Sequence, residues 1–521
     1  MPNELGAPRY ADGIRKRTVD VFGGLDRSRA CSDGGIVHME NMSGDAYPLA
    51  SPRRGRQHLV SFDNPNGIHT SDGIYIAAGT GFYRFEDGLV TELGKLTDTK
   101  KVFATIGSKI VIFPDKCYYD KVDDEFGSLE ASWSGTASFT DGEYAGVEAE
   151  ACRIVTTGAR FPFKVGDAVT VEGADDDENN TTLIVREISS DGKSLGFYEH
   201  SFTNAKSQTL TISRAVPDMD FILENENRLW GCKGDTIYAS VPEDPTNFNV
   251  FDGLASDAYA VNVVSNGDFT AACSYLGYPI FFKEDKVYKV YGSKPSDYQV
   301  MSSASLGVKR GSASSLAVAG EVLYYLSVAG IMAYTGGVPS VVSGALCDDV
   351  LTAVGGSDGL RYYAYLTLSD GSGGVFVYDT RRGQWYREDD TSVCAFAREV
   401  SLYMLTDDGG LYMVNAPEAV GYEVSSVLEF GDFIENSPSY KSTAKIQMRI
   451  ELEEGASVKV EMSFDGGAYE EKYVIDKPGK RSYYIPIAPA RCDHFRVRLC
   501  GIGRWYLYSL TREASIGSDK Y

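Results

Sequence analysis

The chain has 521 residues and a formal net charge of −23, from 50 Lys and Arg against 73 Asp and Glu. This length allows two to four domains with ample cores. The acidic balance excludes ordinary DNA wrapping, which needs clustered cations, although an acidic wall would let DNA slide along a conduit. We also expect no signal peptide and no membrane span. The nine cysteines contain no CxxC pair and are expected to be reduced, in a chain made in a reducing cytoplasm.

Residues 1–57 are predicted to form an extended N-terminal arm. They contain many Pro and Gly punctuators and little hydrophobic periodicity, and they hold nine basic against seven acidic residues. Arg53, Arg54 and Arg56 follow Pro52 and form a basic turn. We expect these arginines to contact an acidic neighbouring subunit or nucleic-acid phosphates, and the alternative is a solvated basic turn.

A strand-turn-strand unit recurs along most of the remaining chain. Aromatic and β-branched residues alternate between glycine turns, which is typical of strands on a half-buried sheet. Seven copies begin at Ile74, Lys109, Arg228, Tyr278, Leu323, Tyr362 and Leu402. Five of the six spacings lie between 35 and 50 residues, near the length of a four-stranded blade. The pattern predicts an all-β protein whose β-propeller occupies residues 58–124 and 215–418, with about seven blades and six as the alternative.

The one long spacing, 119 residues, predicts an inserted small β-barrel or sandwich at residues 125–214. Within this domain, Asp175 to Asn180 is the densest cluster of acids and amides in the chain. It lacks the alternating ligands and central glycine of a Ca²⁺ loop, so a solvated hairpin tip is favoured over a cation site.

Residues 419–521 are predicted to form a C-terminal β-sandwich, because apolar and polar residues alternate over five or six strands. A strand near Ser425 is a candidate to complete the first blade. The many aromatic residues of the repeats are interpreted as packing between blades, and the alternative is an aromatic ladder for glycans or peptides.

Residues 22–56 resemble the opening of tail nozzle and packaged-DNA stabilisation proteins of tailed bacteriophages. In that opening a Gly-rich start precedes a Glu-Asn pair and an Arg-Gly signature, which here fall on Gly23, Gly24, Glu40, Asn41, Arg54 and Gly55. Residues 226–248, with a Ser-x-x-x-Asp-Pro-x-x-Phe loop, and residues 278–292 are similar to successive blades of such proteins. The resemblance implies a ring of identical subunits, a hexamer in this family, around the DNA channel.

No motif of the chain predicts catalysis, and we expect no enzyme, cofactor or metal site. The five histidines lack metal-ligand spacing. Gly355 to Gly359 matches GxSxG, but a strand rather than a helix follows, so a plain turn is expected. Ser463 to Tyr469 approaches the Asp box of sialidase-type propellers and is interpreted as a hairpin turn.

These patterns favour a structural virion protein of a tailed phage or prophage. It would form part of the nozzle or head-to-tail conduit that retains and passes DNA without sequence-specific binding. It would contact other tail and portal-proximal proteins, after assembly in the host bacterial cytoplasm. The alternative is a propeller that binds or cleaves glycans in receptor recognition, and a general interaction scaffold is the third hypothesis.

Overall fold

The computed structural model describes residues 12–29, 31–144, 147–203, 206–416, 424–437, 439–488 and 491–516. The first eleven residues of the predicted arm and the last five of the predicted sandwich lie outside the described residues. In the described ranges the chain forms β-strands and two short 3-10 turns, η1 (Asp177–Asn179) and η2 (Ala313–Ser315), and no α-helix. The chain divides into two compact units, Asn66–Ala313 and Met1–Pro65 with Ser314–Tyr521.

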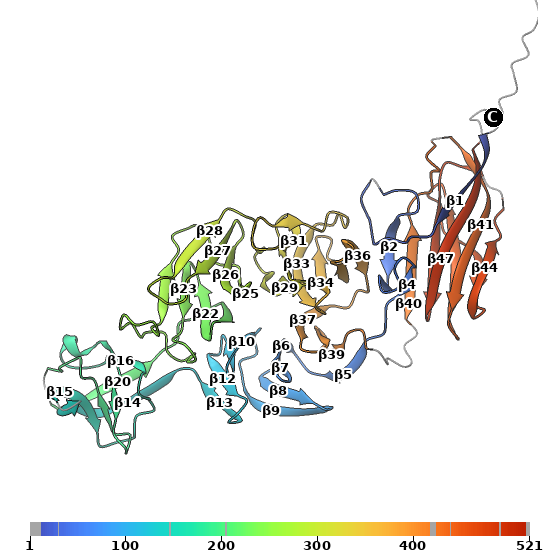
Figure 1. Ribbon diagram of the computed structural model, residues 1–521. Coiled ribbons are helices and arrows are strands. Elements are labelled where there is room, and N and C mark those ends of the chain that lie inside the picture. The colour runs from blue at the N-terminus through green and yellow to red at the C-terminus, as the bar shows by residue number, and fades with distance from the viewer. Residues whose placement is uncertain are drawn as a thin grey trace, which may run out of the picture. The chain divides into compact units, whose positions relative to one another are not determined.

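The repeats form four-stranded antiparallel sheets, which confirms the predicted all-β propeller architecture (Figure 1). Each of the seven predicted copies coincides with the second strand of one such sheet. The first sheet contains β6 (Pro65–Thr70), β7 (Ile74–Ala78), β8 (Gly81–Glu86) and β9 (Leu89–Lys95). The second contains β10 (Val102–Ile106), β11 (Lys109–Phe113), β12 (Cys117–Asp120) and β13 (Glu125–Ser128).

The unit Asn66–Ala313 contains two further propeller sheets. The third sheet contains β21 (Phe221–Asn225), β22 (Arg228–Lys233), β23 (Thr236–Ala239) and β24 (Tyr259–Asn262). The fourth contains β25 (Ala271–Tyr275), β26 (Tyr278–Lys283), β27 (Lys286–Tyr291) and β28 (Gln299–Ser303). Neighbouring sheets of this unit share apolar cores, and the core between the third and fourth includes Trp230, Phe281 and Tyr288.

The other unit holds three sheets of the same kind. The fifth contains β29 (Ala317–Ala319), β30 (Val322–Ser327), β31 (Gly330–Tyr334) and β32 (Ser340–Val341). The sixth contains β33 (Val350–Ser357), β34 (Arg361–Leu368), β35 (Gly373–Asp379) and β36 (Gln384–Arg387). The seventh contains β37 (Val393–Arg398), β38 (Leu402–Thr406), β39 (Gly410–Met413) and β5 (Gln57–Ser61).

Large aromatic side chains fill the space between the sheets, as the sequence predicted. Tyr324 stacks on Tyr362 of the next sheet, with ring centroids 5.2 Å apart. Flat rigid rings fill wide gaps at a low cost in side-chain entropy, which explains their frequency in the repeats. Fully buried examples are Tyr119, Phe281, Tyr325, Tyr362 and Tyr363.

The inserted domain begins at β14, because β13 is the last strand of the second sheet rather than the start of the insertion. Its seven-stranded sheet has the order β17 (Thr182–Ile184), β16 (Ala168–Glu172), β20 (Gln208–Arg214), β14 (Ala131–Tyr144), β15 (Val147–Thr156), β19 (Ser194–Gly196) and β18 (Glu187–Ile188). The cluster at Asp175 to Asn180 contains η1, where Asn179 is buried and its amide donates to the Thr203 carbonyl over 2.9 Å.

Two five-stranded sheets form the terminal sandwich. One contains β1 (Asp12–Val19), β47 (Trp505–Ile516), β41 (Lys441–Leu452) and β44 (Gly479–Ile485), with β45 (Arg491–Cys492) also paired to β41. The other contains β2 (Ile36–Glu40), β40 (Ser425–Phe430), β46 (Phe495–Ile502), β42 (Ser457–Phe464) and β43 (Glu470–Ile475). Their facing side chains include Leu428, Val460, Leu499 and Trp505.

The prediction of an extended N-terminal arm is wrong, because two strands of this segment belong to the sandwich. β1 pairs with β47 from Asp12 opposite Ile516 to Val19 opposite Leu510, and β2 pairs with β40. These strands satisfy backbone groups that the sandwich edges would otherwise leave open. The short strands β3 (Met42–Ser43) and β4 (Ser51–Pro52) then pair with each other before the chain enters β5.

The prediction that a strand near Ser425 completes a blade is also wrong. β40, which starts at Ser425, belongs to the sandwich, and it completes no propeller sheet. Instead β5 forms the outer edge of the seventh sheet, with Val60 opposite Leu411. A strand from the start of the chain therefore completes the sheet formed by the last repeat.

The two enzyme-like strings are turns, as predicted. Ser357 ends β33, and its hydroxyl accepts a hydrogen bond from the Gly359 N–H over 2.9 Å. Ser463 lies in β42, and its hydroxyl donates to the Gly467 carbonyl over 2.6 Å at the turn that leads to β43.

Candidate functional site

A cavity of about 690 Å³ lies between the segment that precedes β5 and the seventh sheet. Arg53, Gly55 and Arg56 line it from the N-terminal side. The remaining lining comes from the connection between β36 and β37, from β38 and β39 and the turn between them, and from one residue before β40. These residues are Asp389, Thr391, Ser392, Met404, Thr406, Asp407, Asp408, Tyr412 and Val424.

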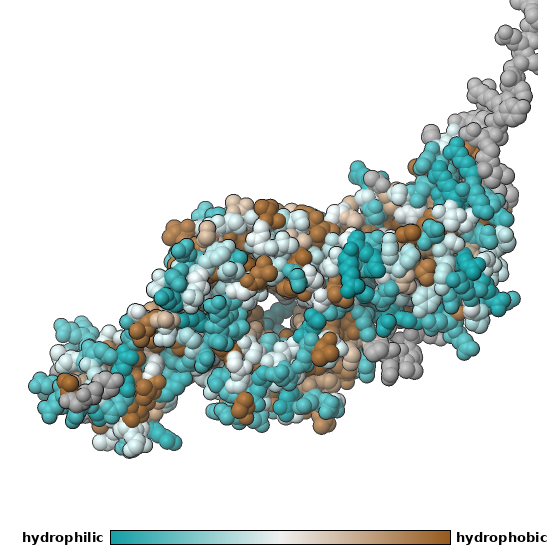
Figure 2. Space-filling model, in the orientation of Figure 1, coloured by the Kyte–Doolittle hydropathy of each residue, from teal (hydrophilic) through white to brown (hydrophobic). Residues whose placement is uncertain are grey.

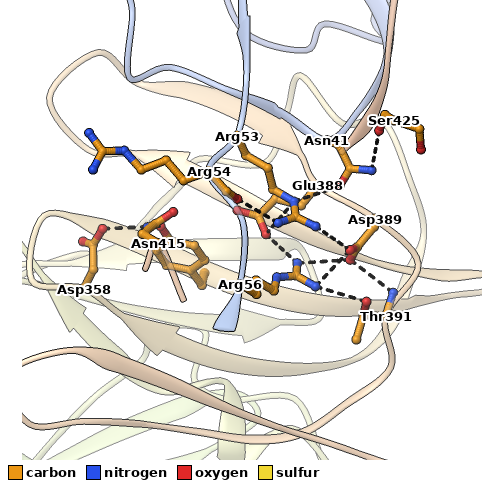
Figure 3. Close-up of polar contacts among 11 residues, drawn as sticks. Asn41, Arg53, Arg54, Arg56, Asp358, Glu388, Asp389, Thr391, Asn415 and Ser425 are labelled. Carbon is orange, nitrogen blue, oxygen red and sulfur yellow. Dashed lines mark hydrogen bonds and ion pairs between the residues drawn. The ribbon is translucent and has the colours of Figure 1, made fainter. Parts of the chain in front are cut away.

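Arg53, Arg56 and Asp389 form one wall of the cavity, the arginine wall, and Glu388 binds both arginines from outside the lining. Figure 3 shows these polar contacts. Arg56 donates to Glu388 over 2.5 Å and to Asp389 over 2.9 Å. Arg53 donates to Asp389 over 3.0 Å. The side chains of Arg56 and Glu388 are only 8% and 5% exposed, so each charge is balanced inside the fold. Charge-assisted pairs of this kind fix geometry strongly.

Burial and the charge of neighbouring groups shift the pKa values of Arg56, Arg53 and Asp389 in opposite directions. Burial lowers the pKa of Arg56, but attraction to Glu388 and Asp389 raises it overall. Burial also lowers the pKa of Arg53, and there it outweighs the neighbouring carboxylates. For Asp389, burial raises the pKa, but Arg56 and Arg53 bring it below its ordinary value. Asp389 is therefore ionised at neutral pH.

Asn41 positions the arginine wall. Its φ of 53° lies in the left-handed region that Asn tolerates better than most residues. The Asn41 amide oxygen accepts from Arg53 Nε over 2.7 Å, and its amide nitrogen donates to the Ser425 carbonyl over 2.8 Å. The Asn41 N–H also donates to the Glu388 carbonyl over 2.5 Å. Asn41 thus links the segment after β2 to the end of β36 and to β40.

Gly24 lets the segment before β2 approach β36. An added Cβ at Gly24 would lie 2.5 Å from the Trp385 carbonyl oxygen, and the Leu25 N–H donates to that oxygen over 2.6 Å. Glu40 contacts Arg387 over 3.6 Å. Gly24, Glu40 and Asn41 of the motif singled out in the sequence therefore pack along β36 and the residue that follows it.

A second part of the lining, the acidic wall, contains Asp407 and Asp408. Asp407 accepts a short hydrogen bond from Ser392, and Asp408 accepts one from Thr406. The Thr406 bond lowers the pKa of Asp408. Within the described residues, neither carboxylate has a Lys or Arg within ion-pair distance. Tyr412 lies beside them and packs its ring edge on His58, with centroids 5.2 Å apart.

The three predicted contact arginines have different environments. The guanidinium groups of Arg53 and Arg56 bind acids of their own chain, Glu388 and Asp389. The Arg54 side chain is 49% exposed and lies 3.9 Å from Asp45. Contact of these residues with a neighbouring subunit or DNA stays a prediction, for which Arg54 offers the accessible group.

Sequence reasoning missed the acidic residues of the cavity. Asp389 and the pair Asp407 and Asp408 stand in short acidic runs next to strand ends, where charged turn residues are common. The pairing of β5 with β39 brings them into one cavity lining with the basic turn. Within the described ranges, no helix has the length and apolarity that a membrane crossing needs.

Comparison with known proteins gives no match to a family model and none to a curated protein. Among solved structures, Hsv2 of Kluyveromyces lactis is 15% identical, with 40% of this chain and 64% of that chain covered and a TM-score of 0.28. BamB of Moraxella catarrhalis is 10% identical over 74% of this chain and 99% of that chain, with a TM-score of 0.30.

An exo-β-1,3-galactanase of Phanerochaete chrysosporium, solved with galactose, is also similar. It is 11% identical over 56% of this chain and 94% of that chain, with a TM-score of 0.22. Because a glycoside hydrolase is among the similar structures, the expectation that the chain is not an enzyme is corrected and withdrawn.

Proposed function

We propose that the cavity beside the seventh sheet binds an uncharged oligosaccharide and that the protein recognises glycans through it. The observation that carries this proposal is that the cavity is lined both by the acidic wall of Asp407 and Asp408 and by an arginine wall whose charge is already balanced. A volume of about 690 Å³ falls in the usual range for small-ligand sites.

The charges of the cavity favour a ligand that donates hydrogen bonds. Arg53 and Arg56 are neutralised by Glu388 and Asp389, so an anionic ligand would meet two cations that are already paired. Asp407 and Asp408 accept hydrogen bonds. Sugar hydroxyls are donors of the kind that carboxylates bind in charge-assisted hydrogen bonds.

The apolar part of the lining suits the same ligand class. Tyr412, Met404 and Val424 border the acidic wall. Sugar rings carry apolar C–H faces between their hydroxyls, and an aromatic side chain with a polar tip covers such a face at little entropic cost. Together the two kinds of lining match a polyol with an apolar face.

Cleavage of the bound glycan is the second part of the proposal. Glycoside hydrolysis uses two carboxyl groups on either side of the scissile bond. Asp389, Asp407 and Asp408 are the acids that line the cavity. The lowered pKa values of Asp389 and Asp408 suit a nucleophile or base. The residue that donates the proton is to be identified by a hydrolysis assay.

A glycan array and a reducing-end assay on bacterial polysaccharides test both parts. The expected result is binding of at least one neutral oligosaccharide by the wild type and its loss in the double variant Asp407→Asn/Asp408→Asn. The matched control, Asp177→Asn/Glu178→Gln, changes the same charge on the inserted domain and keeps binding. A blank array together with an inactive hydrolysis assay would reject the proposal.

We propose as a second candidate a component of a tailed-phage virion, in the nozzle or head-to-tail region. Support comes from the resemblance motifs, because Gly24 and Asn41 pack the N-terminal segment against β36 and β40. Such interlocking suits a part that bears mechanical load. A ring of identical subunits around DNA belongs to this candidate.

Negative-stain microscopy of purified protein and immunolabelling of particles that carry a tagged copy test this candidate. The expected result is a ring and a label at the tail. A protein that is absent from particles would reject the virion role, and it would leave the glycan proposal untouched.

A further inference from the structure

The terminal sandwich has an open rim where its two sheets end side by side. In the described residues, β43 pairs only with β42 and β44 pairs only with β41, so each is the outer edge of its sheet. The rings of Tyr473 on β43 and Tyr483 on β44 have centroids 6.1 Å apart. We call residues 470–485 the rim, and Figure 1 shows its strand β44 at the outside of the sandwich.

The two ends of the rim carry charges of opposite sign. Glu470 and Glu471 stand exposed at the start of β43, where Lys472 contacts Glu470 over 2.6 Å. The other end, at the turn between β43 and β44, carries three exposed cations and one acid. These residues are Lys477, Lys480, Arg481 and Asp476. The rim is therefore negative at one end and positive at the other.

Two cations of the positive end make no ion pair among the described residues. Lys480 lies over the Tyr508 ring at 3.3 Å, and Arg481 Nε donates to the Pro478 carbonyl over 3.4 Å. Within the described part of the chain, neither lies within ion-pair distance of a carboxylate.

The middle of the rim is partly apolar. Tyr473 is 37% exposed, Val474 is 45% exposed and Tyr484 is 58% exposed. The surrounding face over β41, β44 and β47 is largely hydrophilic in Figure 2. Exposed edge strands with apolar side chains offer backbone groups and apolar surface to another strand.

We propose that a second copy of this chain docks on the rim through a two-fold axis, which lies perpendicular to the sheets. β44 would pair antiparallel with β44 of the second copy, and β43 with β43. A two-fold axis brings the same patch of each copy together. The negative end of each rim then faces the positive end of the other, and two charge contacts form at once.

Charges on edge strands often prevent such pairing, which is the competing role for Glu470, Glu471, Lys480 and Arg481. The two roles differ in arrangement. Protective charges need no order, whereas docking of identical copies needs opposite signs at opposite ends. The inference depends on this order and on neither proposed function.

Charge exchange tests the proposal in the full-length protein by sedimentation velocity over a concentration series. The wild type is expected to form a dimer. Glu470→Lys/Glu471→Lys and Lys480→Glu/Arg481→Glu each place like charges together and weaken dimerisation at least about tenfold. The variant that combines all four substitutions restores opposite charges and recovers the dimer.

Asp177→Lys/Glu178→Lys, on the inserted domain, makes the same change in net charge as the first pair and is expected to leave the dimer intact. Unchanged thermal unfolding of each variant excludes misfolding as the cause of dissociation. A wild type that stays monomeric at all concentrations would overturn the proposal. So would a combined variant that dissociates as readily as its parents, or a closed ring of more copies as the sole assembly.

Discussion

At the scale of single residues, the arginine wall shows which groups the basic turn of the sequence contacts in the fold. The basic turn at Arg53, Arg54 and Arg56 was predicted to contact an acidic neighbouring subunit or nucleic-acid phosphates, and that contact stays a prediction. Two of the three arginines instead bind Glu388 and Asp389, more than 300 positions away in the same chain. Buried ion pairs contribute little net stability when intact, but breaking one leaves an uncompensated charge.

Replacement of Arg56 by methionine is expected to lower the free energy of unfolding by roughly 3–5 kcal/mol, because Glu388 keeps a buried charge without its main partner. The measurement is chemical denaturation at neutral pH. Arg54→Met is the matched control, since Arg54 is half exposed, and it is expected to cost no more than about 0.5 kcal/mol. Equal effects of the two variants would contradict the assignment.

His69 gives the chain a specific sensitivity to acid. Its ring accepts or donates a hydrogen bond with Thr105 over 2.7 Å and stacks on Phe103. Burial, with a smaller effect of Lys121, lowers its pKa to about 4. The unfolded chain therefore takes up the His69 proton first as the pH falls, so stability is lost between about pH 6.5 and pH 4.

The expected size of this loss is at most about 3 kcal/mol, from the shift of the His69 pKa. Denaturation curves of the wild type and His69→Gln at several pH values measure it. The stability advantage of the wild type over the variant should shrink as the pH falls through this window. An advantage that stays constant from pH 7 to pH 4 would show that His69 titrates normally.

At the scale of elements, local signals and long-range contacts differ in how far the sequence predicts them. The seven repeat starts matched second strands of sheets because alternation and glycine turns are encoded within a few residues. The pairing of β5 with β39 and of β1 with β47 joins segments from the two ends of the chain. No local pattern specifies such partners, so the arm was predicted as extended.

The same limit explains the candidate site. The resemblance singled out Asn41, and the basic turn singled out Arg53 and Arg56. The two arginines line the cavity, and Asn41 accepts a hydrogen bond from Arg53. Asp407 and Asp408 lie in a turn whose composition is ordinary for a strand connection. Their role emerges only from the fold, because β5 must first join the seventh sheet.

Gly409 tests the contact between β5 and β39. It has a φ of +90°, and an added Cβ would lie 1.7 Å from the Phe62 carbonyl oxygen. Gly409→Ala is expected to destabilise the protein by clearly more than the about 1 kcal/mol that a positive φ alone costs. Gly466→Ala, at a turn with open space and a φ of +71°, is the control. Similar melting temperatures for both variants would contradict the packing of β5.

Removal of β1 tests the corrected arm. Deletion of residues 1–19 leaves the edge of β47 without its partner and removes the Arg17 contacts with Glu435 and Asp33. A loss of about 2 kcal/mol would lower the melting temperature by roughly 4–8 °C. Deletion of residues 1–11 removes no residue of β1 and is the control. A chain without residues 1–19 that melts at the same temperature as the wild type would contradict the role of β1.

At the scale of the whole molecule, the chain combines a propeller, an inserted β domain and a terminal sandwich that both ends of the chain help to build. The unit Met1–Pro65 with Ser314–Tyr521 contains the cavity and the rim, so the proposed glycan site and the proposed docking surface belong to the same compact unit. Hydrogen bonds and ion pairs hold Arg53, Arg56 and Asp389 of the cavity lining in place, which reduces the entropy cost of binding.

The most direct test of the glycan site is calorimetric titration of the oligosaccharide that the array identifies. The wild type is expected to bind it at a single saturable site, and Tyr412→Ala is expected to bind at least about tenfold more weakly, which corresponds to about 1.4 kcal/mol. Tyr291→Ala removes a partly exposed tyrosine from the fourth sheet and should bind as the wild type does. Equal affinity of the wild type and Tyr412→Ala, or no saturable binding by the wild type, would contradict the account.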